Sequence, residues 1–210
     1  MEIFVVFHSE RGRVYQLAEA IAEGARSVKG TSVEVFQASD ILLENNPEGR
    51  NEFHEEMNQF SHVPYVKAGD LARADAVIFG TPSKFGMMAP QMRYLLNKME
   101  SLWAEGAMIG KIGSVFTSAT LNHGGQESAL TGFHIALLHL GMIIVGVPYC
   151  EERLLPMEPI SGRNPYGATL ISRTQIPFHP SHTEIGIARF QGQYVAEITS
   201  FLTRGRALSK

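Results

Sequence analysis

The turn Ser9-Glu10-Arg11-Gly12-Arg13 combines residue types that are suited to binding a phosphate group. It follows an apolar stretch, residues 3–7, and from Val14 onward apolar residues recur at helical spacing. A loop between a buried strand and a helix presents free backbone N–H groups and the positive end of the helix dipole. Ser9 adds a hydroxyl donor, Gly12 lets the backbone approach closely, and the two arginines add positive charge. Phosphate binding and an ordinary polar strand-to-helix connection both remain open at this turn.

This turn differs from two widespread nucleotide-binding motifs. No Gly-Lys-Ser or Gly-Lys-Thr follows it, as in a P-loop, and it lacks the three spaced glycines of the dinucleotide fingerprint. A short polar turn of this kind suits a single terminal phosphate, such as that of flavin mononucleotide (FMN).

Two further polar loops follow apolar stretches. In residues 80–86, Pro82 fixes a turn, and Phe85 either offers its ring or backbone to an aromatic ligand or packs in an ordinary polar turn. Residues 118–127 are small and glycine-containing, so their main-chain donors can face a planar, acceptor-rich ring such as a flavin. The alternative for this segment is a glycine-rich connection that binds no ligand.

The elements that must position these loops alternate between strand and helix. Strands are predicted at residues 3–7, 32–37, 76–80, 113–118 and 142–147, and helices at 14–25, 91–99, 126–140 and 184–202. Alternation predicts an α/β fold, with a doubly wound five-stranded parallel sheet and helices on both faces. The three polar loops should then converge at the carboxyl edge of the sheet.

Two segments show no clear period. Residues 40–67 are rich in Asn, Glu and His, with a short helix expected near 51–60. Residues 151–183 carry many Pro, Gly and Ser residues. Long irregular segments in compact domains are usually functional or disordered.

Composition narrows the class of protein. The chain has 210 residues, 44% of them hydrophobic, and a net charge of -3, which predicts one folded domain and gives no basic surface for nucleic acid. No apolar stretch is long enough for a membrane span, and no basic leader precedes the first strand, so we expect a cytoplasmic protein. The single cysteine, Cys150, excludes an intrachain disulfide and is expected to be a small buried hydrophobe. The histidines show no metal-ligand spacing, and no Ser-His-Asp order is evident, so no metal is expected.

Two single residues have open interpretations. Trp103, the only Trp, is either a core anchor or a wall of an aromatic pocket. His139 ends the predicted helix 126–140, where a His more often interacts with the helix C-terminus than with a ligand.

Taken together, the motifs resemble the WrbA-type NAD(P)H:quinone oxidoreductases, a flavodoxin-like family, over nearly the whole chain. The resemblance rests on six segments in the family's order: Ile78-Phe79-Gly80-Thr81-Pro82-Ser83-Lys84-Phe85-Gly86, Leu102-Trp103-Ala104, His123-Gly124-Gly125-Gln126-Glu127, Leu138-His139-Leu140-Gly141-Met142, Asn164-Pro165-Tyr166-Gly167-Ala168 and Ala188-Arg189-Phe190-Gln191-Gly192.

The resemblance implies a single flavodoxin-like domain, residues 1–210, that binds FMN non-covalently and assembles as a homotetramer. It implies that NADH or NADPH delivers hydride to the flavin and that a quinone then takes it, in a ping-pong reaction. The flavin carries this chemistry, so no catalytic side chain is assigned, with His139 as the one candidate.

By position, the resemblance also implies the site residues. The FMN phosphate would contact Ser9, Glu10, Arg11, Gly12, Arg13 and Val14, and the ribityl chain and ring would contact Ser83, Lys84 and Phe85. The isoalloxazine would lie along Ser118, Ala119, Thr120, Leu121, Asn122, His123 and Gly124. His139 corresponds to an FMN-contacting histidine of the family, and Trp103 to a substrate-pocket residue.

The chain departs from the family pattern in four places. Arg11 replaces an aromatic residue that holds the nicotinamide, Arg13 replaces a smaller group or a His, Met87 replaces an Asn, and the loop 118–125 has exchanged glycines for other residues. We expect Arg11 to take over as a nicotinamide-side contact, because a guanidinium can stack on a flat ring. Two rivals remain: a flavodoxin-like electron carrier without quinone reductase activity, against which a net charge of only -3 argues, and a flavin-free signalling or assembly protein on the same fold.

Overall fold

The structure, a computed structural model, describes residues 1–38, 58–155, 161–171 and 179–208. Its centre is a sheet of six strands, all of whose pairings are parallel. The strand order is β2-β1-β3-β4-β5, and β6 also pairs with β4. The strands are β1 (Glu2–Phe7), β2 (Ser32–Gln37), β3 (Ala76–Pro82), β4 (Ile112–Ala119), β5 (Ile143–Ile144) and β6 (Thr169–Ile171).

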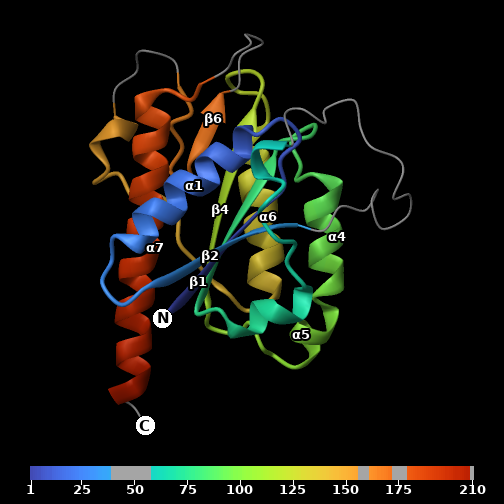
Figure 1. Cartoon of the computed structure of the whole chain (residues 1–210), viewed down its shortest axis with the longest axis vertical. Coiled ribbons are helices and arrows are strands. Elements are labelled where there is room, and N and C mark those ends of the chain that lie inside the picture. The colour runs from blue at the N-terminus through green and yellow to red at the C-terminus, as the bar shows by residue number, and fades with distance from the viewer. Residues whose placement is uncertain (39–57, 156–160, 172–178, 209–210) are drawn as a thin grey trace.

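Helices cover both faces of this sheet (Figure 1). One face carries α1 (Arg13–Arg26) and α7 (His182–Leu208); the other carries α4 (Pro90–Lys98), α5 (Glu100–Ala104) and α6 (Gln126–His139). Three 3₁₀ turns, Asn58–Phe60, Ala68–Arg73 and Glu152–Leu154, complete the described elements. Within the described ranges, no helix is long and apolar enough to cross a membrane.

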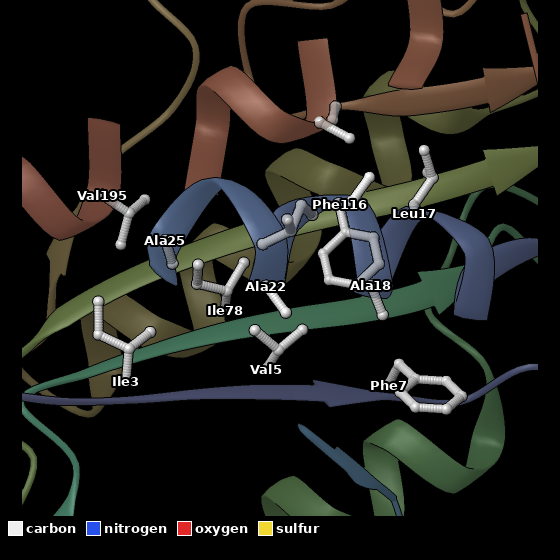
Figure 2. Close-up of a cluster of buried hydrophobic side chains, with 14 of the residues drawn as sticks. Ile3, Val5, Phe7, Leu17, Ala18, Ala22, Ala25, Ile78, Phe116 and Val195 are labelled. Carbon is white, nitrogen blue, oxygen red and sulfur yellow. The ribbon is translucent and has the colours of Figure 1, made fainter. Parts of the chain in front are cut away.

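The two faces have separate hydrophobic cores because side chains alternate along each strand. In β1, Ile3, Val5 and Phe7 pack beneath α1 and α7 (Figure 2), while Phe4 and Val6 pack toward α4 and α6. All five side chains are fully buried. A parallel strand that is buried on both faces reads as a continuous apolar run, which explains why β1 was recognisable in the sequence.

Helices α1 and α7 approach each other closely enough to require glycine. A Cβ at Gly24 would lie 1.9 Å from the carbonyl oxygen of Arg189, and one at Gly192 would lie 1.9 Å from that of Ile21. Each helix thus uses its own glycine to admit the backbone of the other.

The predicted architecture is confirmed, with differences in detail. The sixth strand, β6, was not predicted, β5 covers only two residues of the predicted strand 142–147, and α7 extends beyond the predicted 184–202. Most of the short helix expected near 51–60 lies outside the described residues. The expectation of a buried cysteine is wrong, because Cys150 is exposed.

The close contact at Gly192 predicts that alanine substitutions at two glycines of α7 change the stability of the fold in opposite directions. Gly192→Ala should destabilise the fold by about 1–3 kcal/mol, because the new methyl group overpacks a backbone contact that cannot move aside. Gly205→Ala is the matched control on the same helix, since its Cβ meets no described atom within 4 Å. There, helix propensity alone should stabilise by about 0.5–1 kcal/mol. Thermal unfolding of both variants tests this; an unchanged midpoint for Gly192→Ala would contradict the contact.

Candidate cofactor site

A cavity of about 230 Å³ opens at the carboxyl edge of the sheet. It is lined by residues of all three polar loops: Ser9, Glu10, Arg11, Arg13 and Val14 from the first, Pro82, Ser83 and Lys84 from the second, and Ser118, Ala119 and Thr120 from the third. The predicted convergence of the loops is therefore confirmed. It follows from the parallel sheet, which places the carboxyl ends of β1, β3 and β4 side by side.

The first loop is arranged to receive an anion. Ser9 is only 3% exposed, and its hydroxyl oxygen has no hydrogen-bond partner among the described residues. Gly12 takes a φ of 71° as the N-cap of α1, and within the described part of the chain no side chain caps this helix end. Orphaned N–H groups, the helix dipole and a buried hydroxyl that lacks a partner thus meet at one place.

The first turn of α1 is held in place by ring packing. The ring of Tyr15 lies 5.4 Å from that of Phe7 and 5.5 Å from that of Phe60, measured between centroids. Burial, and to a lesser degree the charge of Glu19, raises the pKa of the Tyr15 hydroxyl, so this residue stays neutral. The helix N-terminus therefore rests on an apolar cluster from β1 and the 3₁₀ turn at 58–60.

Charged side chains from two loops line the cavity. Among the described lining residues, Arg11, Arg13 and Lys84 are cationic and Glu10 is the carboxylate. Lys84 Nζ lies 2.7 Å from Glu10 Oε2, so this ion pair links the first loop to the second across the cavity. The two guanidinium groups at the same cavity are of a type that suits a phosphate.

The second loop is a tight hairpin that presents Phe85 to solvent. Lys84 and Met87 exchange backbone hydrogen bonds of 2.8 and 3.0 Å, and the two residues between them, Phe85 and Gly86, both have positive φ. This conformation is costly for a non-glycine residue. The Phe85 side chain is fully exposed, so the interpretation of a packed ring in an ordinary turn is wrong.

The third loop is fastened to the second. The Ser83 hydroxyl donates to the carbonyl oxygen of Gly125 at 3.2 Å, and the Ser83 amide donates to that of Ser118 at 2.8 Å. A Cβ at Gly125 would lie 2.7 Å from the Cα of Gly86, so only glycine permits this backbone approach. Gly125, in the segment whose main-chain donors were predicted to face a flavin, thus makes room for the neighbouring hairpin.

The remaining predicted site residues lie outside the cavity lining. Gly12 acts through its backbone, and Phe85, Leu121, Asn122, His123 and Gly124 are exposed beyond the lined part. His123 takes a φ of 55° and its Nδ1 lies 3.9 Å from the Glu127 carboxylate. Pro82 lines the cavity although it was assigned only a turn-forming role; its position at the end of β3 was the available signal.

Trp103 and His139 are not brought to this cavity. Both line a second, larger groove of about 630 Å³ between α4, α5 and α6, together with Arg93, Asn97 and Glu100. Because α4 and α6 start at the carboxyl ends of β3 and β4 and run back along the sheet, this groove lies at the opposite edge (Figure 1). Trp103 is 60% exposed, which excludes the core-anchor interpretation.

Comparisons with known proteins agree with this geometry. The model of the family described as NADPH-dependent FMN reductase matches residues 1–150. A protein of Aromatoleum aromaticum named NAD(P)H dehydrogenase (quinone) is 46% identical over 207 residues, covering 99% of this chain and all of the relative. One of Trichlorobacter lovleyi with the same name is 48% identical over 202 residues, covering 96% and 98%.

A solved structure shows the fold. The WrbA-like flavodoxin from Agrobacterium tumefaciens has a TM-score of 0.61 at 21% identity, over 95% of this chain and 98% of its own. The sequence relatives decide the family, because they are nearly half identical from end to end. The chain therefore belongs to the NAD(P)H dehydrogenase (quinone) family, the WrbA-type proteins that its motifs resemble.

Proposed function

We propose that the chain is an FMN-dependent NAD(P)H:quinone oxidoreductase formed by a single domain. The observation that carries the proposal is the buried hydroxyl of Ser9, which has no hydrogen-bond partner among the described residues and lies beside the start of α1 in a cavity lined by Arg11, Arg13 and Lys84. The names of the full-length relatives support a quinone reductase over an electron carrier.

The residues present fit FMN at its phosphate. Ser9 and the first backbone N–H groups of α1 would donate to the phosphate oxygens, while Arg13 would balance its charge. Ser83, Ser118 and Thr120 bring hydroxyl groups to the same cavity, and these suit a ribityl chain.

The chain's own part in the reaction is to bind, orient and shield. The fastened second and third loops give fixed main-chain donors for a flavin ring, and the exposed Phe85 and Leu121 offer apolar surface beside the cavity. When bound, FMN would supply the hydride-transfer chemistry that links a nicotinamide to a quinone.

Phosphate recognition gives the first test of this function. FMN should bind more tightly than riboflavin, because each charge-assisted hydrogen bond contributes about 1.5–3 kcal/mol. Ser9→Ala should narrow that gap by about tenfold, or about 1.4 kcal/mol, while leaving riboflavin binding unchanged. Titrations followed by flavin fluorescence measure both ligands, and the FMN-loaded protein should reduce a benzoquinone at the expense of NADH or NADPH. Equal affinity for the two flavins, or no quinone reduction, would overturn the proposal.

Arg11 is proposed as a nicotinamide-side contact, in place of the family's aromatic residue. Arg11→Ala should raise the KM for the nicotinamide more than it weakens FMN binding, because the guanidinium would serve the second ligand. Arg13→Ala is the matched control, since Arg13 belongs to the first turn of α1 and should act mainly on FMN. Steady-state kinetics and FMN titration separate the two variants. If Arg11→Ala loses FMN at an unchanged KM, Arg11 belongs to the phosphate.

We also propose a homotetramer in which the flavin site is completed by another subunit. The cavity that the described residues line, about 230 Å³, is smaller than the roughly 300–1,000 Å³ of most ligand pockets. Trp103 and His139 lie at the opposite edge and are exposed, so they can serve a flavin only in another copy. Beside them, Ile135 and Leu138 leave the outer side of α6 apolar, as in helices that are covered by a partner.

Light scattering at micromolar concentration should therefore give the mass of four chains. Leu138→Glu should lower that mass and the quinone reductase activity together, because a charge enters an apolar contact surface. Phe201→Glu on α7 is the matched control, because Phe201 is similarly exposed but lies on the other side of the sheet. A monomer with full activity would show that each chain carries a complete site.

A further inference from the structure

The short strand β6 does not line the cofactor cavity itself but pairs with the end of β4 that does. Leu170 and Ile171 are in register with Ser118 and Ala119, both of which line the cavity. A strand of three residues has little pairing of its own to hold it in place. Its position must therefore be set from its other side.

Helix α7 holds β6 at both ends with side-chain acceptors. Gln191 Oε1 accepts a hydrogen bond of 2.7 Å from the amide of Ala168, and Glu184 Oε1 accepts one of 2.9 Å from the amide of Ile171. The two acceptors are seven residues apart, so they lie on one face of the helix, two turns from each other.

Glu184 also accepts hydrogen bonds from residues outside β6. Its Oε1 also accepts from the amide of Gly162 at 3.0 Å, and its Oε2 accepts from both the amide and the hydroxyl of Ser181 at 2.8 Å. Glu184 is 4% exposed. A Cβ at Gly162 would lie 1.9 Å from the carbonyl oxygen of Thr169, so this segment packs directly against β6.

The Oε2 contacts form a capping box at the start of α7, as the spacing Ser181-x-x-Glu184 requires. A capping box uses only one oxygen of the carboxylate, so it does not account for the contacts of Oε1. Here Oε1 accepts hydrogen bonds from the amides of Gly162 and Ile171. It therefore couples the start of α7 to β6, the strand that pairs with the cavity-lining end of β4.

We propose that Glu184 is a positioning residue of the cofactor site. It does not line the cavity; it acts through Ile171, which sets the place of Ala119, and through Ala119 on the FMN held there. The inference rests on the proposed function in that FMN is the ligand. Without the carboxylate, two buried N–H groups lose their acceptor, β6 shifts, and FMN is bound less tightly by a protein that remains folded.

Variants at Glu184, Ser181 and Thr199 separate positioning from stability. Glu184→Ala removes both oxygens, Ser181→Ala removes one partner of Oε2 and leaves the Oε1 contacts, and Thr199→Val changes a buried group of α7 that bonds only to Val195 within the described chain. For each, FMN affinity is titrated by flavin fluorescence well below the unfolding midpoint of the apoprotein. Hydrogen exchange of the Ile171 and Ala119 amides is followed in the same apoprotein.

Glu184→Ala should weaken FMN binding at least about tenfold and speed exchange at Ile171 and Ala119. Ser181→Ala and Thr199→Val should lower the unfolding midpoint with less than about a twofold change in affinity. Glu184→Gln should recover much of the affinity, because its amide oxygen can still accept from Ile171. Should Glu184→Ala fail to fold, Glu184→Asp replaces it, because a side chain one methylene shorter draws the acceptor away from the Ile171 amide and should weaken FMN binding in the same direction.

If Thr199→Val or Ser181→Ala lost as much FMN affinity as Glu184→Ala at a matched unfolding midpoint, Glu184 would have only a structural role. Unchanged affinity and exchange in both Glu184 variants would do the same. A wild-type protein that fails to bind FMN would instead overturn the proposed function, and the exchange rates would still report whether Glu184 holds β6.

Discussion

The close contact between α1 and α7 is the constraint on which the rest of the molecule depends. Gly24 and Gly192 let the two backbones touch, so helices from the two ends of the chain share one face of the sheet. Each helix then serves the cofactor cavity with its first turn: α1 starts at the anion-binding loop, and α7 starts at the residues that hold β6. A bulkier residue at either glycine would separate the helices and move both ends of the site.

A buried polar contact extends this constraint into the sheet. Gln191 is fully buried, and its amide nitrogen donates to the Ser114 hydroxyl at 2.7 Å and to the carbonyl oxygen of Val115 at 2.9 Å. Ser114 in turn donates to the carbonyl oxygen of Val145 at 2.6 Å. Because every polar atom in this chain of contacts has a partner, α7 can sit in only one register against β4. These buried contacts of Gln191 thus fix the position of the sheet edge that carries the cavity.

The sequence was informative where function depends on local chain order. The first strand, the turn after it and α1 are neighbours in sequence, so the period change at Ser9 was enough to mark this turn as a candidate anion site, with an ordinary polar connection as the alternative. The convergence of the three loops could be predicted without any knowledge of long-range contacts, because neighbouring parallel strands end at the same edge of the sheet. The sequence was silent on β6, because three residues among prolines and glycines carry no period, and their strand forms only against β4. It also could not show that Trp103 and His139 lie at the opposite edge of the sheet from the cavity, since a role assigned by position carries no information on where the residue lies relative to the three loops.

The ion pair between Glu10 and Lys84 has a consequence for how the cavity responds to dissolved salt. Lys84 Nζ lies 2.7 Å from Glu10 Oε2, and the two side chains are 41% and 36% exposed, so ions in solution screen their attraction. High ionic strength therefore weakens the tie between the first and second loops, whereas the uncharged contact of Ser83 with the third loop keeps its strength.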